Sequence, residues 1–194
     1  DQSGDVFWPS LGINQIGGIN FNEGYIVKMN YESSGNNLVL SGDLVPSDTA
    51  MMFNEGWSII SYLNKNPAPV ADMMSSIEEN LIIIKDEDGL IYWPEFGVNS
   101  MSNMYPGRGY QIKLNSDFLF SYNSISSTRF SDFTNNIETT YYSNPQKTGE
   151  NMTIGIPVSS WSFLPSLGDE VGVFSSDGIL VGKGVFNGKS MAIS

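Results

Sequence analysis

The sequence contains neither cysteine nor histidine, and these two absences exclude several kinds of chemistry. Without histidine there is no Ser-His-Asp or Cys-His arrangement, no common zinc site and no usual general base near neutral pH. Without cysteine there is no disulfide scaffold, so packing must hold the folded state together, and the cellular compartment is left open. Basic residues are also scarce, since 9 Lys and Arg stand against 21 Asp and Glu, for a net charge of -12. Binding of nucleic acid or anionic lipid needs clustered Lys and Arg, so neither partner is expected.

Long hydrophobic runs are absent as well. No apolar stretch approaches the roughly 20 residues of a membrane-spanning helix, so membrane insertion is not expected. No signal peptide is recognisable, and the chain starts at Asp1 without an initiator Met, from which we expect processing, cleavage or a fragment of a longer protein. The 194 residues suffice for one large or two small domains with a proper core.

An internal repeat is the most informative feature that is present. Residues 1–30 align with residues 86–115 at a constant offset of 85 and without a gap. Ten of the thirty pairs are identical, and nearly half of the others exchange one apolar residue for another. The identical positions in the first copy are Asp1, Gly4, Trp8, Pro9, Gly12, Asn14, Gly24, Tyr25, Lys28 and Asn30. Internal repeats indicate modular architecture.

The second copy belongs to a longer unit, residues 56–115, predicted as strand, helix, strand, hairpin, Gly/Pro loop and strand. One amphipathic helix is predicted over about residues 68–80, after prolines that suit a helix start. Its apolar residues recur at the i, i+3, i+4, i+7 spacing: Val70, Met73, Met74, Ile77 and Leu81. A buried strand at residues 81–85 is predicted to turn at residues 86–89 into another strand.

The first copy begins in the middle of such a unit. It is predicted to contain a strand at Tyr25–Met29, but it lacks the Gly-Trp strand, the helix and the central strand that precede the turn in the second copy. An uncovered apolar face and unpaired backbone groups are costly, so something should cover Phe7 and Trp8. Upstream sequence, the second copy across a pseudo-symmetric sheet, or a neighbouring molecule would each serve. If nothing covers this face, we expect the alignment of residues 1–30 with 86–115 to be wrong.

The remaining segments lead to a division into three parts. Residues 1–50 are a partial first unit with a connector that includes a short strand at 38–40, and residues 51–116 are the complete unit. Residues 117–194 are predicted as a Ser/Asn/Thr-rich connector with a strand or two, followed by an antiparallel β-sandwich-like region that we expect to be truncated. Its hairpin signals are Asp177-Gly178 and Asn187-Gly188.

These segments carry a family resemblance. The complete unit resembles an uncharacterised module of large secreted proteins of marine and gliding Bacteroidetes and of structural proteins of marine phages. The matching motifs are GWSIISY at 56–62, IIIKD at 82–86, GLIYWPE at 89–95, GVN at 97–99 and PGRGYQIKL at 106–114. A second resemblance, to another module of the same secreted proteins, covers GENMTI at 149–154, GDEVGVF at 168–174 and GILVG at 178–182. Together they span roughly two thirds of the chain and imply no activity.

Few residues are candidates for chemistry. Asp86-Glu87-Asp88-Gly89 departs from the calcium-loop pattern, because Ile84 stands where a further ligand is needed, so a hairpin turn is the better interpretation. Trp8 and Trp93 are candidate platforms for sugar rings, although a large residue recurring in both copies is more simply explained by packing.

Two other kinds of site are weaker still. Five carboxylates are candidates for an acid–base pair in glycoside cleavage, but adjacent ones point apart, so no pair is indicated: Glu78, Glu79, Glu95, Asp169 and Glu170. Thr49, in Asp48-Thr49-Ala50, fits a short pattern that resembles O-glycosylation sites of Bacteroidetes.

The sequence therefore predicts a mainly β protein with one helix and no enzymatic activity. The expected function is a non-catalytic structural or adhesion module of a larger secreted bacterial surface protein or filament, located at the cell surface. A phage virion protein, such as a fibre or decoration protein, is the alternative, and a carbohydrate-binding module is the third. Expected partners are other segments of the same polypeptide, neighbouring subunits or glycans, and no cofactor or metal is expected.

Overall fold

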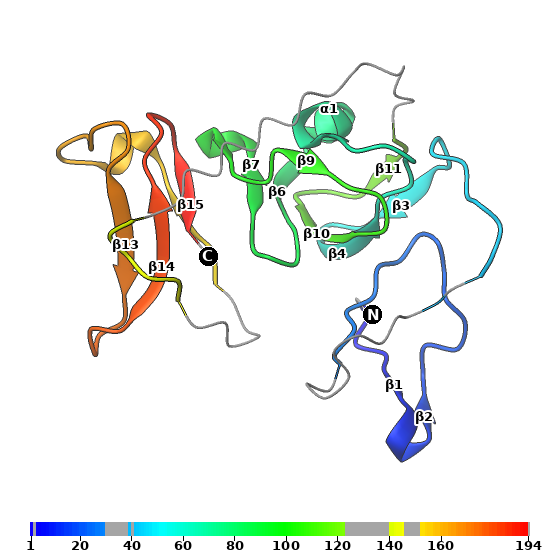
Figure 1. The fold of residues 1–194 in the computed structure, drawn as a ribbon. Helices are drawn as coiled ribbons and strands as arrows, with labels where there is room; N and C mark the ends of the chain where they lie inside the picture. Colours follow the sequence, from blue (N-terminus) through cyan, green and yellow to red (C-terminus); the bar gives the residue numbers. More distant parts are fainter. Residues whose placement is uncertain (2, 30–38, 40, 123–139, 146–151, 194) are drawn as a thin grey trace.

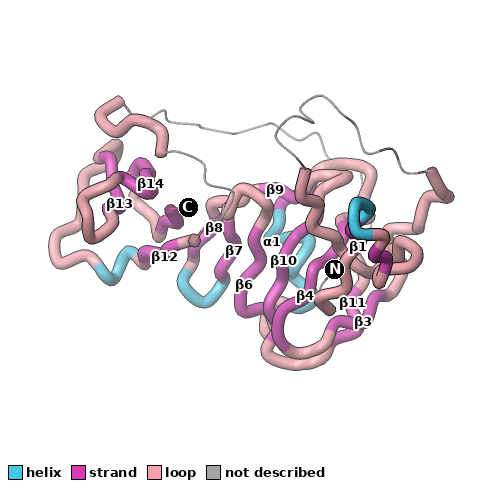
Figure 2. The backbone as a smooth tube through the Cα atoms, turned by 90° about the horizontal axis from the view of Figure 1, so that it is seen from below, coloured by secondary structure: helices cyan, strands magenta, loops and turns pink. Residues whose placement is uncertain are grey.

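A computed structural model of the chain describes residues 1, 3–29, 39, 41–122, 140–145 and 152–193. It is mainly β, as predicted, and every strand pair described is antiparallel. The first copy of the repeat, the complete unit and the C-terminal region follow one another across the molecule (Figures 1 and 2). Within the described part, no helix is long and apolar enough to cross a membrane.

The complete unit is built on a five-stranded sheet. Its spatial order is β4–β10–β6–β7–β8, so β10 inserts between two strands that precede it in the chain. The strands are β4 (Gly56–Ser61), β6 (Leu81–Lys85), β7 (Ile91–Trp93), β8 (Val98–Asn99) and β10 (Gly109–Leu114). Burial alternates along the two long strands, so that Ile60 and Ile112 point into the core while Trp57 and Lys113 lie on the opposite face.

One short helix covers the inner face of this sheet (Figure 1). It comprises α1 (Val70–Met74) and the 3-10 turn η3 (Ser75–Ile77), so the predicted range of 68–80 is too long. Ala68–Pro69 forms strand β5 instead, paired with β9 (Asn103–Met104). At the other end, Ser75 Oγ donates to the Asp72 carbonyl (2.8 Å), a local bond that competes with regular helix.

The predicted apolar stripe of the helix is nevertheless correct. Val70, Met73, Met74 and Ile77 are all buried in the main core. A second sheet, β3 (Met51–Phe53) with β11 (Phe118–Phe120), adds to that core. Residues just beyond position 116 thus pack into the complete unit, and the three-part division remains a prediction.

The first copy has the same local geometry as its counterpart, which confirms the repeat. The equivalent elements are β1 (Phe7–Trp8), η1 (Pro9–Leu11) and β2 (Ile13–Asn14), matching β7, η4 (Pro94–Phe96) and β8. Trp8 has φ -128° and ψ 89°, and Trp93 has φ -128° and ψ 90°. Gly12 and Gly97 end the 3-10 turns in the left-handed region, at φ 67° and 61°.

Side-chain hydrogen bonds recur at the same offset. Each copy uses an Asn side chain and then a Tyr hydroxyl as acceptors for backbone N–H groups. The pairs are Gly17 N–H to Asn14 Oδ1 (2.9 Å) and Ser102 N–H to Asn99 Oδ1 (2.9 Å), and Asn20 N–H to Tyr25 Oη (2.9 Å) and Tyr105 N–H to Tyr110 Oη (2.7 Å). The alignment is therefore right over residues 1–25.

The copies differ in the strand that comes next. The prediction of a strand at Tyr25–Met29 is wrong, because the segment forms no strand in the structure. β10 has a partner strand on each side, whereas in the described part of the chain residues 25–29 have none. Among the described residues, the two copies also do not form one pseudo-symmetric sheet, because β1 and β2 pair there only with each other.

The face around Phe7 and Trp8 is exposed. An uncovered face was expected to contradict the alignment, but the shared hydrogen bonds show that this criterion is wrong. The first copy instead touches the complete unit beside β4. There the Gly24 N–H donates to the Ile59 carbonyl (2.8 Å), and Ser61 Oγ donates to the Phe21 carbonyl (2.6 Å).

The C-terminal region consists of two antiparallel strand pairs around a small core, in keeping with the predicted sandwich-like region. Its elements are β12 (Ile154–Ile156), η5 (Val158–Ser160), β13 (Glu170–Phe174), β14 (Leu180–Val185) and β15 (Met191–Ile193). β12 pairs with β15 and β13 with β14, around Phe186, Met191 and Ile193. Asp177-Gly178 makes the predicted hairpin, whereas Asn187-Gly188 joins strands of different sheets.

Two predicted features fall partly outside the described residues. Of the short strand at 38–40, only residue 39 is described, and it has no strand assignment. Much of the connector also lies outside, in residues 123–139 and 146–151.

Candidate functional site

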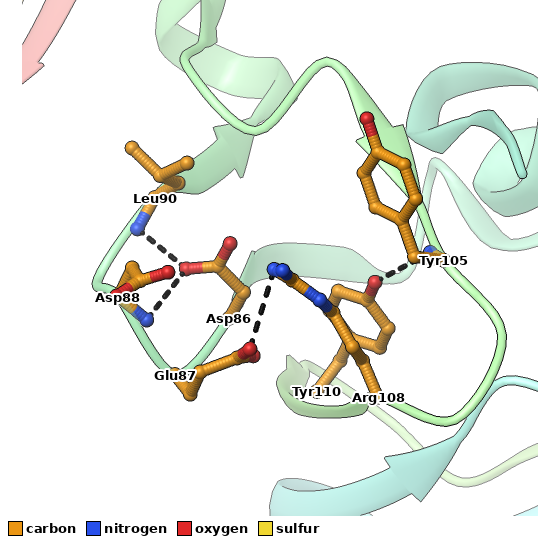
Figure 3. A network of polar contacts seen from close by, with 7 residues as sticks. All are labelled: Asp86, Glu87, Asp88, Leu90, Tyr105, Arg108 and Tyr110. Atoms are coloured by element: carbon orange, nitrogen blue, oxygen red, sulfur yellow. Dashed lines mark hydrogen bonds and ion pairs between the residues drawn. The ribbon is translucent and has the colours of Figure 1, made fainter.

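Residues 86–89 form the acidic turn whose sequence most resembles a calcium-binding loop. Asp86 Oδ1 accepts hydrogen bonds from the N–H groups of Asp88 (3.0 Å) and Leu90 (2.8 Å), and Figure 3 shows the carboxylate turned into its own loop. Burial raises the pKa of this carboxyl, and the two hydrogen bonds oppose that effect in part. Beside it, Arg108 pairs with Glu87 at 3.2 Å and ties the Gly/Pro loop to the turn (Figure 3).

The first copy makes the same turn. Asp1 Oδ1 accepts from the N–H groups of Ser3 (2.9 Å) and Asp5 (3.0 Å), the counterparts of Asp88 and Leu90. The turn is therefore confirmed in both copies, because each aspartate accepts hydrogen bonds from its own loop, and in the second copy it joins β6 to β7 as a hairpin. Among the described residues, no three His, Cys, Asp or Glu side chains are grouped so that they would hold a metal ion.

The two candidate tryptophans have different surroundings. Trp93 lies against Phe96 in an edge-to-face arrangement, with ring centroids 4.6 Å apart. Its ring also borders β12, because a Cβ added to Gly155 would lie 3.2 Å from Cζ3 of the indole. Trp8 is about half exposed on the first copy. Trp93 is thus placed at the junction with the C-terminal region, while Trp8 offers an open ring.

Thr49 lies in a turn between the first copy and β3, where its N–H donates to the Pro46 carbonyl (3.1 Å). The residue is partly exposed. A hydroxyl on such a turn suits modification from solvent.

Three of the five candidate carboxylates accept hydrogen bonds from backbone N–H or hydroxyl groups. Glu78 accepts from the Tyr92 hydroxyl (3.0 Å), and Asp169 accepts from the Ser166 N–H (2.8 Å). Burial and the Glu78 carboxylate raise the pKa of Tyr92 to about 12. Glu170 accepts from the N–H groups of residues 140–142. These contacts hold turns and neighbouring segments in place.

The structure brings together a group that the sequence interpretation missed. On the outer face of the five-stranded sheet, Trp57 of β4 lies beside Lys113 of β10 and Lys85 of β6. The two ammonium groups are 5.8 Å and 5.6 Å from the centroid of the indole ring, within the range of cation–π attraction. Trp57 remains 52% exposed. This cluster offers an apolar ring flanked by two positive charges, on a protein that is otherwise strongly acidic.

An open hollow of about 240 Å³ adjoins the cluster. It is lined by Trp57, Ser58 and Ile59 of β4, by Gln111 of β10 and by Asp1 of the first copy. An acidic group beside a flat apolar surface, as in an acidic sugar, has the complementary chemistry. The alternation of β4 was the available signal, since it places Trp57 on the face opposite Ile60.

No protein-family model, curated protein or solved structure matches this chain.

Proposed function

We propose that this chain is a non-catalytic structural module of a larger extracellular surface protein or filament. The observation that carries the proposal is the repetition of one hairpin, with the same backbone angles and the same side-chain acceptors, in two adjoining parts of the chain. A side chain that acts on a substrate is needed once, whereas a scaffold repeats its packing unit. The Asp86 and Asp1 carboxylates serve their own turns.

The location at the cell surface is supported by the resemblance to secreted modules and by the position of Thr49. The alternative within the same resemblance is a phage virion. The complete reading frame distinguishes the two, because a downstream secretion signal supports the surface protein and neighbouring capsid and tail genes support the virion protein.

The test of the main proposal is an activity screen of the purified chain against polysaccharides and peptides, followed by product analysis. No turnover is expected. Turnover that disappears on replacement of one carboxylate, such as Glu95→Gln, would overturn the proposal.

A second candidate function is binding of an acidic glycan, and the Trp57 cluster favours it. A glycan array of the whole chain is expected to show binding to uronic or sulfated sugars. Trp57→Ala is expected to weaken that binding at least about tenfold, since truncation of an aromatic residue at the centre of a binding site typically costs about 2 kcal/mol or more. Trp93→Ala is the comparison: an affinity lost there, in a folded protein, would place the site at Trp93 instead.

A further inference from the structure

The first copy exposes the apolar residues that the second copy buries. Phe7 is 62% exposed and its counterpart Tyr92 8%, Ile19 is 62% exposed and Met104 0%, and Val27 is 56% exposed and Ile112 0%. The same contrast holds for three more pairs: Val6 with Ile91, Ile13 with Val98, and Met29 with Leu114. Of these counterparts, Tyr92, Met104, Ile112 and Leu114 belong to the main core of the complete unit, whereas Ile91 and Val98 do not. We call the four first-copy residues that match the core members the acceptor face: Phe7, Ile19, Val27 and Met29.

The second copy shows what covers such a face. Residues 56–85 supply β4 and β6, which flank β10, and also α1 and η3, which pack on the same core. Ile112 of β10 lies opposite Ser58 on one side and Ile84 on the other. The equivalent of that segment is what the acceptor face lacks in the described structure.

The backbone at Asp1 is already arranged for such a segment. The Asp1 nitrogen donates to the Asp5 carbonyl (2.9 Å), as the Asp86 N–H donates to the Leu90 carbonyl (3.0 Å) directly after β6. A strand that ended at the Asp1 nitrogen would therefore enter the turn as β6 does. The contacts of the first copy with β4 involve Phe21 and Gly24, which precede residues 25–29.

We propose that the acceptor face binds a strand–helix–strand segment of the kind formed by residues 56–85, whose two strands flank residues 25–29. This proposal goes beyond the proposed function and holds wherever the protein acts. A second copy of this chain is not the occupant, because its own residues 56–85 already bury Ile112 and Leu114 of its complete unit. The occupant is a separate segment of the same pattern: a Gly-Trp strand, an apolar helix stripe and an Ile-rich strand.

The test is a fusion in which a second copy of residues 56–85 is placed directly before Asp1 of the full chain. Hydrogen exchange at the amides of residues 25–29 is expected to slow by about a hundredfold or more, because these amides enter a hydrogen-bonded sheet. The matched control carries Ile60→Asp and Ile84→Asp in the added segment only. Fast exchange at residues 25–29 in the fusion, or equal slowing in the control, would overturn the proposal.

A substitution within the acceptor face adds an independent measurement. Val27→Asp is expected to leave the melting temperature of the unfused chain unchanged, because the side chain is exposed. In the fusion it is expected to abolish the slow exchange of residues 25–29. A large loss of stability in the unfused chain would show that the face is already covered.

Two further results decide the identity of the occupant. Residues 56–85, supplied as a separate polypeptide behind a solubility tag, are expected to shift the NMR signals of residues 25–29 saturably, and the absence of any shift counts against the proposal. Slow exchange at residues 25–29 that grows with the concentration of the unfused chain would identify a second copy as the occupant and overturn it as well.

Discussion

At the scale of single residues, the two copies of the repeat place different residues at the same backbone position. Ser102 lies in the left-handed region at φ 60°, where its counterpart Gly17 has φ 70°. In both copies the backbone N–H of this residue donates a hydrogen bond to the side chain of an Asn three residues earlier, which stabilises the turn. A side chain in this region costs about 1 kcal/mol, which glycine avoids.

Ser102→Gly is therefore expected to stabilise the protein by up to about 1 kcal/mol. Ser102→Ala keeps the Cβ and is expected to remain at or below the original stability. Denaturant unfolding of the three proteins, followed by circular dichroism, measures the order. A glycine variant less stable than the original chain would contradict the explanation.

Glu170 controls a contact that depends on pH. Desolvation raises the pKa of this carboxyl, but the hydrogen bonds from Tyr142, Tyr141 and Thr140 outweigh it, and the pKa falls to about 2 from its ordinary value of 4.5. A lowered pKa stabilises the folded state above pH 4.5, and this contribution is lost as the pH falls towards 2. Residues 140–142 should therefore stay attached to β13 until strongly acidic pH.

The amide signals of Thr140, Tyr141 and Tyr142 are expected to titrate together with a midpoint near pH 2 in NMR spectra. Glu170→Gln removes the charge and should abolish the titration. A midpoint near 4.5 would show that the carboxylate is not held by these amides.

At the scale of elements, the contact between the first copy and β4 depends on a close approach. A Cβ added to Gly24 would collide with Cγ2 of Ile59, whose carbonyl accepts the Gly24 N–H. Gly18 is the matched control, because its φ is not positive and an added Cβ there would meet nothing within 4 Å.

Gly24→Ala is expected to detach the first copy from β4, at a cost of about 1–3 kcal/mol to that contact. Hydrogen exchange of residues 19–24 should accelerate, while the melting of the complete unit stays the same because its core is untouched. Gly18→Ala should exchange as the original chain does. Unchanged exchange in Gly24→Ala would mean that the contact does not hold the first copy.

Two elements show that the secondary structure predicted from the local sequence pattern can be changed by strand pairing in the fold. The stripe Val70, Met73, Met74 and Ile77 is buried as its spacing predicts, yet the helix is shortened because Ala68–Pro69 joins β9. Likewise Tyr25–Met29 has the sequence of a strand but no partner among the described strands. Local pattern specifies which side chains face inward, whereas strand identity requires a neighbour.

At the scale of the whole molecule, the complete unit and the C-terminal region meet where β7 begins. Thr153 Oγ1 donates to the Gly89 carbonyl (2.9 Å), and Gly155 lies against Trp93. This is also where the Asp86 turn ends. The turn that recurs in both copies therefore serves, in the second copy, as the attachment point of another part of the chain.

Thr153→Val is expected to lower the unfolding free energy by about 1 kcal/mol, because the partly buried Gly89 carbonyl loses its donor. Thr153→Ser keeps the hydroxyl and should retain most of the stability. Denaturant unfolding gives the free energies, and small-angle scattering reports any separation of the two parts. Equal stability of the valine and original proteins would exclude a role for this bond.

The sequence by itself determined the repeat, the mainly β class, the turns at Asp1 and Asp86 and the inward face of the helix. These features depend on residues close together in the chain, whose backbone preferences and burial period are visible without the fold. Only the tertiary structure decided that β10 lies between β4 and β6, that Trp57 meets Lys85 and Lys113, and that the acceptor face is open. Those features depend on pairing between segments that are distant in the chain. The two copies have the same local geometry, yet one is buried and the other exposed, so the neighbouring segments determine the burial.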